Sequence, residues 1–386
     1  RTATRRPTTT TRTADEGTEG PVEGSTPNIG GSLNGRAYRL EDDFGLIERC
    51  GTDWLHAFLD VREKYERGVS PEEDPDVVAL RRAGQEMGTN LFVTLQWNFI
   101  GIFGEKQPTG VPPEGSARER DLIEYATALL SAIDQPVAVV GLGNEPVWET
   151  MDDDFLGSDT RLIPFTRTLK DHLVEHYVDD DTRIVIGAFN RFYDTVWDDY
   201  KHFFRRLIDV ARTDEDVDGI DLHIHYYHLQ QAETMLEVAR REFPDGMVTV
   251  TEFSPIFRYA DNQDKPIASF EGGERFAKRH EIAGDTTVTE YLEGAKDDRL
   301  SPQEIADFYA TMPWYNVDFV SDMYDLLDRY DVEVGTFGFL VDDDVHNVDW
   351  TDGWSPFPIN CLFQPALIDT PHGAHPHYLP DFLDVV

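Results

Sequence analysis

The sequence predicts an α/β protein in which eight parallel strands close into a (β/α)8 TIM barrel. Three observations lead to this class. From residue 28 onward, eight short apolar segments alternate with amphipathic helical segments. Strict alternation of strands and helices is typical of a parallel sheet covered by helices. The length of 386 residues suits eight such units, and a doubly wound open sheet is the alternative.

Residues 1–27 come first and differ in composition from the rest of the chain. They contain almost no large apolar side chains and are rich in Thr, Arg, Gly and Pro, which is typical of a disordered tail or linker. We therefore expect an N-terminal arm or linker over 1–27 and a barrel with a C-terminal extension over 28–386. The arm is either a solvated linker or a segment that becomes ordered on a partner, such as another copy of the chain or a larger assembly.

The elements of the barrel then follow in chain order. The expected strands cover residues 28–33, 53–61, 90–97, 137–144, 183–189, 219–227, 247–253 and 334–341. The expected helices cover residues 41–50, 74–88, 117–133, 162–177, 198–212, 231–243, 301–312 and 317–330. Two long connecting segments, 98–118 and 253–302, are expected to cover part of the barrel mouth.

Polar side chains gather at the C-terminal ends of these strands. In such a barrel the loops that follow the strands form one rim, and chemistry takes place there. The sequence therefore predicts a functional site at this rim. The polar residues at the strand ends are Asp60, Gln96, Asn98, Asn144, Glu145, Asn190, Arg191, His223, His225, His228, Thr251, Glu252 and Asp342.

Two of these strand ends carry a glutamate, Glu145 after the fourth strand and Glu252 after the seventh. Alternation along the seventh strand places Glu252 on one face with Val248 and Val250. A pair of carboxylates across a barrel mouth is the usual equipment for cleaving a glycosidic bond. One stays protonated to donate to the leaving oxygen, and the other stays ionised to attack the anomeric carbon.

The segments "GNEP" and "VTEFS" resemble the signatures of the clan A glycoside hydrolases, which are retaining enzymes on a (β/α)8 barrel and include cellulases, mannanases and xylosidases. The resemblance implies that Glu145 is the general acid/base and Glu252 the nucleophile. It also implies that Asn144 binds the sugar 2-hydroxyl. Clan members often carry His-x-Tyr on strand six, which His225 and Tyr227 match.

The resemblance covers roughly residues 28 to 345, with two departures from the clan pattern. His56 stands where many members have an arginine on strand two that supports the nucleophile. Phe337 or Phe339 stands where many members have a strand-eight tryptophan under the first sugar. Because histidine lacks the permanent charge of arginine, the nucleophile should become more sensitive to pH.

Further residues of the rim are candidates for sugar contacts. Trp97 and Asn98 end the third strand, and Trp148 lies two residues after Pro146. An indole face can stack on a sugar ring, which makes Trp148 the strongest aromatic candidate. The predicted substrate-binding residues are Asn144, His56, Trp97, Asn98, Trp148, His225, Tyr227 and Phe337.

No metal or cofactor is predicted. Alternation places His223 and His225 on one strand face while His228 falls on a loop, so these histidines are expected to serve the core or the sugar. The acidic run from Asp342 is interpreted as solvated. Cys50 and Cys361 match no metal spacing, and two free buried thiols are favoured over one disulfide.

The charge of the chain is unusual, with 74 Asp and Glu against 34 Lys and Arg and a formal net charge of -40. Such a surface repels nucleic acids and anionic membranes. It suits a halophilic source, because molar salt shortens the Debye length to ~3 Å and screens self-repulsion. No apolar run approaches the ~18 residues of a membrane span. We expect an extracellular or cell-surface location.

The favoured function is a retaining glycoside hydrolase that cleaves a β-glycosidic bond in a poly- or oligosaccharide by double displacement. The alternative is a non-catalytic glycan-binding protein, or a surface or virion structural protein built on the same barrel. Retention of both Glu145 and Glu252 favours catalysis. A doubly wound oxidoreductase is disfavoured because no G-x-G-x-x-G follows the first strand.

Overall fold

A computed structural model of the chain describes residues 27–34, 37, 44–101, 108–156, 161–312, 315–341 and 360–386. Nearly all of the predicted N-terminal arm and the acidic run from Asp342 lie outside these residues. The division of the chain into an arm over 1–27 and a barrel after it therefore stays a prediction.

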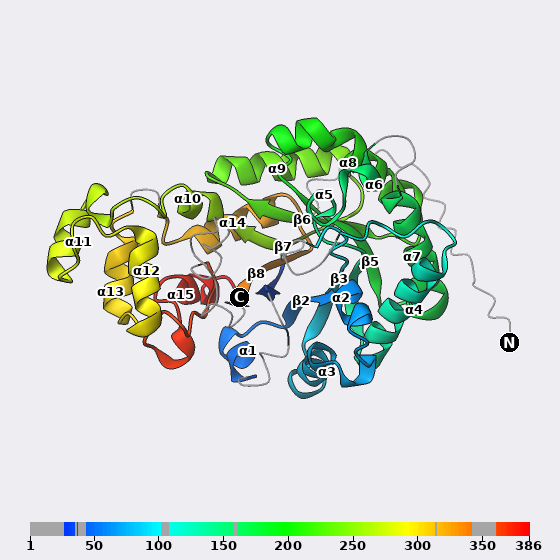
Figure 1. Cartoon of the computed structure of the whole chain (residues 1–386), viewed down its shortest axis with the longest axis horizontal. Helices are drawn as coiled ribbons and strands as arrows, with labels where there is room; N and C mark the ends of the chain where they lie inside the picture. The colour runs from blue at the N-terminus through cyan, green and yellow to red at the C-terminus, as the bar shows by residue number, and fades with distance from the viewer. Residues whose placement is uncertain are drawn as a thin grey trace, which may run out of the picture.

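The predicted barrel is confirmed, and the alternative of an open doubly wound sheet is wrong. Eight parallel strands pair in sequence order, and β8 closes on β1. Helices surround this sheet on its outer side (Figure 1). The strands are β1 Asn28–Asn34, β2 Trp54–Asp60, β3 Asn90–Gln96, β4 Val137–Gly141, β5 Arg183–Asn190, β6 Gly219–His225, β7 Met247–Ser254 and β8 Val334–Val341.

The interior of the barrel has an apolar layer near the N-terminal ends of its strands. Five strands contribute to this cluster, which is separate from the main core between sheet and helices; its buried members are Phe92, Val139, Val185, Met247 and Val334. Toward the mouth the interior becomes polar. His56 on β2 lies there between Ser32 and Thr94, and Asp221 on β6 lies against Thr249.

The helices begin and end where local sequence signals predict. Helix α3 illustrates this: the Asp74 carboxylate caps its first backbone N–H groups, Pro75 opens it, and Gly88 ends it in a left-handed conformation. The longer helices that cover the barrel are α3 Pro75–Met87, α4 Ala117–Ala132, α7 Leu162–His176, α8 Thr195–Thr213, α9 Leu229–Glu242 and α14 Phe319–Arg329. The shorter ones are α1 Gly45–Cys50, α2 Val61–Glu66, α5 Pro146–Glu149, α6 Asp152–Phe155 and α15 Tyr378–Leu383.

A helical lobe projects from the barrel between β7 and α14, at the left of Figure 1. It has its own hydrophobic cluster, built around Phe276, Phe308 and Tyr309. Part of the C-terminal segment joins this cluster through Leu367 and Ile368. The lobe contains α10 Ile256–Ala260, α11 Gly273–Arg279, α12 Val288–Asp297 and α13 Pro302–Tyr309.

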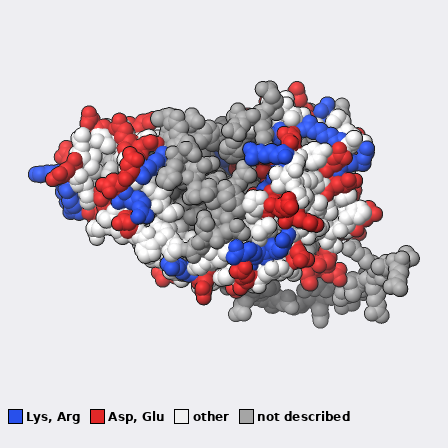
Figure 2. Space-filling model, turned by 60° about the horizontal axis from the view of Figure 1, so that its bottom comes forward, with Lys and Arg blue, Asp and Glu red and all other residues white. Residues whose placement is uncertain are grey.

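Both cysteines are free and buried, which confirms that prediction. Burial raises the pKa of Cys50 to about 12, so this thiol stays protonated. Within the described residues, no helix is both long and apolar enough to cross a bilayer. Acidic and basic side chains are interspersed over the described part of the face shown in Figure 2.

Candidate active site

The structure brings Glu145 and Glu252 together at the C-terminal ends of the strands. Glu145 directly precedes α5, in a left-handed conformation with φ of 32°. Glu252 lies near the end of β7. Their side chains are 23% and 13% exposed, so both are partly accessible. Both carboxylates approach one atom, Nδ1 of His223, at 3.2 Å from Glu145 Oε1 and 3.6 Å from Glu252 Oε2.

These two distances limit the separation of the two carboxylates. Because Glu145 Oε1 and Glu252 Oε2 flank one nitrogen, the two oxygens lie within about 7 Å of each other. This limit includes the ~5 to 5.5 Å that retaining glycosidases use, and it lies at the lower end of the ~6.5 to 9.5 Å of inverting ones. The pair is therefore close enough to act on one bond.

The strand alternation that we expected for Glu252 is wrong, although its position at the mouth is as expected. Val248 and Val250 belong to the main core outside the sheet, whereas Thr249 and Thr251 bond Asp221 inside the barrel. The pairing of β6 with β7 then shifts by one residue after Val250. This bulge turns Glu252 inward after Thr251.

Histidine and asparagine side chains hold the two carboxylates. His225 Nε2 lies 3.3 Å from Glu252 Oε2, and its Nδ1 lies 2.9 Å from the Ser254 hydroxyl. Asn190 at the end of β5 donates from Nδ2 to Glu145 Oε1 at 3.1 Å. Each glutamate therefore has a partner besides His223.

The electrostatics of the site centre on His223. Burial alone would lower its pKa, but the neighbouring charges of Glu252, Glu145 and Asp221 outweigh burial and raise the pKa to about 9. Burial likewise would raise the pKa of Glu145, but the hydrogen bond and charge of His223 outweigh it, and the pKa of Glu145 is lowered. The raised pKa of His223 favours an imidazolium beside the two glutamates at neutral pH.

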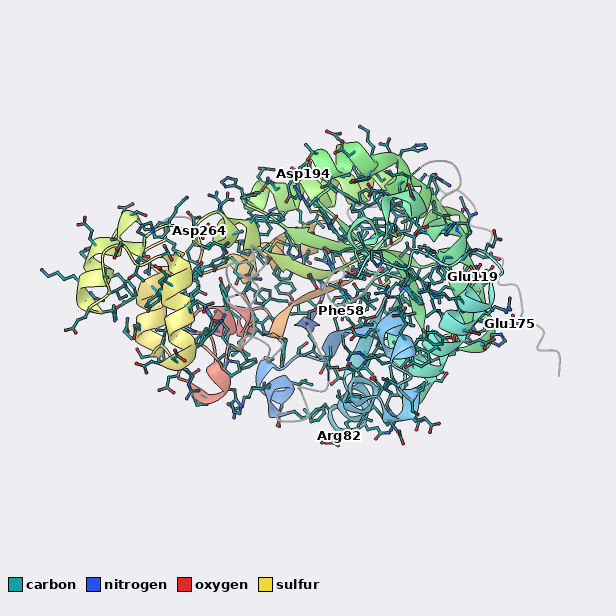
Figure 3. All side chains as sticks on the ribbon, viewed as in Figure 1. Phe58, Arg82, Glu119, Glu175, Asp194 and Asp264 are labelled. Atoms are coloured by element: carbon teal, nitrogen blue, oxygen red, sulfur yellow. The ribbon has the colours of Figure 1, made fainter. Side chains whose placement is uncertain are left out.

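His56, predicted to bind substrate in place of an arginine, is fully buried inside the barrel. Its ring nitrogens face the hydroxyls of Ser32 and Thr94 at 2.8 and 2.9 Å, and burial lowers its pKa well below the usual value. Phe58, two residues further along β2, lies over it with ring centroids 4.6 Å apart and faces His223 at 6.3 Å. Figure 3 places Phe58 centrally within the barrel. Strand β2 thus presents an aromatic ring to the site.

A second carboxylate network lies beside the first, at the ends of β3 and β4. Its centre is Glu149 on α5, which is 2% exposed and which sequence reasoning missed. Asn144 Nδ2 donates to Glu149 Oε1 at 2.7 Å and Gln96 Nε2 at 2.8 Å. The backbone N–H of Trp97 donates to Glu149 Oε2 at 3.2 Å. The backbone N–H of Asn98 donates to the same oxygen at 3.4 Å. Glu149 thus fixes the amide of Asn144 next to the proposed acid.

The predicted aromatic contacts fall into two groups. Trp97 and Phe337 are buried: Trp97 packs on Phe99 and Phe165 and donates from Nε1 to a backbone oxygen, and Phe337 packs on Phe253. Both side chains therefore pack in the hydrophobic core beneath the rim.

Trp148 and Tyr227 are more accessible. Trp148 is 39% exposed on α5, three residues after Glu145, and Tyr227 is half-buried with its ring 5.1 Å from that of Phe257. These two side chains are the aromatic candidates that a sugar can reach.

Three side chains of the site could approach one cation, because single ligand atoms of Glu145, His223 and His225 lie within 4.8 Å of one another. The same residues also form ion pairs, His223 with Glu145 and His225 with Glu252. His228 contacts Arg258 instead. The absence of a metal and of a cofactor stays a prediction.

No protein-family model and no curated protein sequence matches the chain. Solved structures do match it. It is similar to the exo-beta-1,4-mannosidase Op5Man5 from Opitutaceae bacterium strain TAV5, with a TM-score of 0.54 and 14% identity, over 94% of this chain and 59% of that one. It is also similar to a glucosidase from Croceicoccus marinus, with a TM-score of 0.53 and 10% identity, over 94% of this chain and 66% of that one. A third similar structure is CbXyn10B in native form, with a TM-score of 0.51 and 12% identity, over 93% and 96% of the two chains. At these identities the likeness shows the fold alone.

Proposed function

We propose that this protein is a retaining glycoside hydrolase that cleaves a β-glycosidic bond by double displacement. The observation that supports this most is the approach of both Glu145, four residues after β4, and Glu252, on β7, to His223 Nδ1. A glycan-binding protein needs neither carboxylate in this arrangement. Two of the similar structures, a mannosidase and a glucosidase, agree with the proposal.

In the first step Glu252 attacks the anomeric carbon while Glu145 protonates the leaving oxygen, which gives a covalent glycosyl ester. His225, 3.3 Å from Glu252 Oε2, orients the nucleophile. In the second step water attacks the anomeric carbon, Glu145 takes the proton of this water, and Glu252 leaves as a carboxylate. The configuration at the anomeric carbon is thereby retained.

The proposed sugar contacts come from Asn144, which is buried beside Glu145, and from Trp148, which is exposed at the rim. Asn144, held by Glu149, faces the hydroxyl beside the reacting carbon. The exposed indole of Trp148 stacks on a sugar ring. The substrate is a poly- or oligosaccharide with β-linked units.

The test is a screen of aryl β-glycosides and β-glycans in ~3 M KCl, where electrostatic self-repulsion is screened. Glu252→Ala should abolish turnover of every substrate. Glu145→Ala should spare the first step for an activated aryl leaving group, which needs no proton. Glu271→Ala, on the exposed surface of the lobe, is the matched control. Equal losses for both site variants on the activated substrate would reassign the roles, and an inverted product would rule out double displacement.

The source, the location and the assembly of the protein are proposed from its composition. A net charge of -40 supports a halophilic source and, with a glycan substrate, action outside the cell or at its surface. Assembly through the N-terminal arm is proposed because four arginines near its start can meet the acidic surface of another copy.

A further inference from the structure

The proposed mechanism leaves one proton without a source. A retaining glycosidase needs a protonated acid in its resting state, yet the pKa of Glu145 is lowered, by contact with His223 above all, against the effect of burial. The nearest N–H to Glu145 on a charged group is that of His223 Nδ1, at 3.2 Å. The proton that Glu145 donates to the leaving oxygen must therefore come from a neighbouring group.

Hydrogen bonds beneath His223 determine its protonation. The Thr251 hydroxyl lies 2.5 Å from Asp221 Oδ2 and 3.1 Å from His223 Nε2. Asp221 Oδ1 accepts from the Thr249 hydroxyl at 2.7 Å and from the backbone N–H of Thr251 at 3.2 Å. Asp221 is 2% exposed, so these protein groups take the place of water around it.

A threonine hydroxyl has one proton to donate. With that proton on Asp221 Oδ2, the Thr251 oxygen can only accept from His223, so Nε2 carries a proton. On the opposite side of the ring, Nδ1 faces carboxylate oxygens of Glu145 and Glu252, which only accept when ionised. With these carboxyl groups ionised, both ring nitrogens are therefore donors, and the hydrogen-bond arrangement makes His223 an imidazolium.

We propose that His223 supplies the acid proton to Glu145, and that Asp221, acting through the Thr251 hydroxyl, is the positioning residue that keeps His223 charged. This inference rests on the proposed glycosidase function and deepens it. It assigns a role to a column of three side chains, Asp221, Thr251 and His223, that runs from the barrel interior to the mouth.

The proton transfers balance over one turnover. The proton of His223 Nδ1 moves to Glu145 Oε1 and then to the leaving oxygen as the glycosidic bond breaks and the Glu252 ester forms. The ring of His223 is then neutral. When water attacks the ester, its proton passes to Glu145 and back to Nδ1, and Glu252 leaves ionised. Each group ends in its starting state.

Three carboxyl groups and two histidines face His223. Burial raises the pKa of Asp221, and the charge of His223 and the hydroxyls of Thr251 and Thr249 oppose this rise. Glu145 approaches from the end of β4 and Glu252 from β7, while Asp221 and His225 lie on β6 itself. From β2, His56 lies behind the Phe58 ring, and its lowered pKa keeps it neutral. Carboxylates therefore dominate the field at the ring, in agreement with a pKa of about 9 for His223.

The test uses the full chain labelled with ¹⁵N-histidine, and it follows ring protonation against pH without substrate. The chain has 12 histidines, and His223→Gln identifies the signal. In the wild type we expect the His223 ring to be protonated on both nitrogens at neutral pH and to titrate at about 9. Thr251→Val should move this titration to lower pH, and Thr251→Ser should restore it.

Thr249→Val is the matched control, because Thr249 also donates to Asp221 and is also fully buried but does not touch His223. It should leave the titration close to wild type. A neutral ring at neutral pH in the wild type, or equal shifts for the Thr249 and Thr251 variants, would overturn the proposal.

A kinetic arm then separates this proposal from the proposed function. On a substrate with a poor leaving group, the alkaline limb of kcat/KM should follow the His223 titration and move to lower pH in Asp221→Asn. His223→Gln should lose more rate on that substrate than on an activated aryl glycoside, up to the ~10² to 10⁴-fold of general acid catalysis. If the ring is charged but no glycan is cleaved, the glycosidase proposal fails. If glycans are cleaved but the alkaline limb of kcat/KM stays at the same pH in Asp221→Asn, the proposed proton transfer from His223 fails instead.

Discussion

Replacing Glu149 by glutamine should change how stability depends on pH. Glu149 is buried at the end of α5, where burial raises its pKa from the ordinary value of 4.5 to about 8, although the donors Asn144, Gln96 and Trp97 oppose this rise. The folded chain therefore binds this proton more tightly than the unfolded chain does. The free energy of unfolding that depends on it is present in full below pH 4.5 and is lost as the pH rises through about 8.

The size of the effect follows from the pKa. One pKa unit corresponds to about 1.36 kcal/mol, so the rise from 4.5 to about 8 amounts to on the order of 5 kcal/mol. Glutamine has no proton to lose. Relative to wild type, Glu149→Gln should therefore gain stability across this window by up to that amount. Below the window the two proteins should differ by the rearrangement of the neighbouring amides of Asn144 and Gln96.

The assay is urea unfolding at a constant ~3 M KCl over a series of pH values, with wild type and variant side by side. Other titrating groups are common to both proteins and cancel in the difference. Glu119→Gln is the control, since Glu119 is also 2% exposed but lies on α4. A difference between wild type and Glu149→Gln that stays constant from pH 4.5 to above 8 would refute the reasoning.

Two further predictions concern the charge and the arm. With a net charge of -40, the melting temperature should fall as KCl is reduced from ~3 M to ~0.1 M, because the Debye length lengthens several-fold; an unchanged value would count against a halophilic origin. Deletion of residues 1–27 should leave hydrolysis intact and, if the arm mediates assembly, should reduce a defined oligomer to smaller species on a sizing column. Identical sizing profiles before and after deletion would leave the arm as a linker.

The strands of the barrel were predictable because parallel strands are buried on both faces and appear as continuous apolar runs. The eighth strand agrees with its expected range over 334–341, and the fifth differs by one residue at Asn190. The fourth is shorter, since it ends at Gly141 before the turn that presents Asn144 and Glu145. Apolar runs locate a strand better than they locate its end, because the chain stays apolar as it leaves the sheet.

The orientation of Glu252 was not predictable from alternation alone. A bulge at Thr251 inserts one residue into the β7 ladder and reverses the alternation after it. The threonines at positions 249 and 251 were the available signal, because polar side chains at alternate positions of a buried strand need partners inside the barrel. Their partner, Asp221, lies on the neighbouring strand.

Glu149 was missed for a different reason. It follows Glu145 by four residues in "NEPVWE", where a surface glutamate of a short helix is equally expected. Its contacts come from four donors at or just beyond the ends of β3 and β4, which no local pattern reveals. Likewise, the sequence shows His56 on strand two, but no local pattern singles out His223 as the residue that approaches both glutamates.

In the proposed site the positive charge comes from His223 on β6 and not from an arginine. The barrel must then also bury the groups that keep this histidine protonated. An arginine is charged at any relevant pH and needs no help to remain so. A buried histidine loses its charge unless acceptors face both nitrogens, and only one side of the His223 ring faces the two glutamates. The other side therefore needs an acceptor whose own proton is donated elsewhere, which is the arrangement of Thr251 over Asp221. If His223 has the proposed role, Thr251 and Asp221 are what a charged histidine needs at this position, and the charge beside the two glutamates should change with pH, whereas an arginine would stay charged.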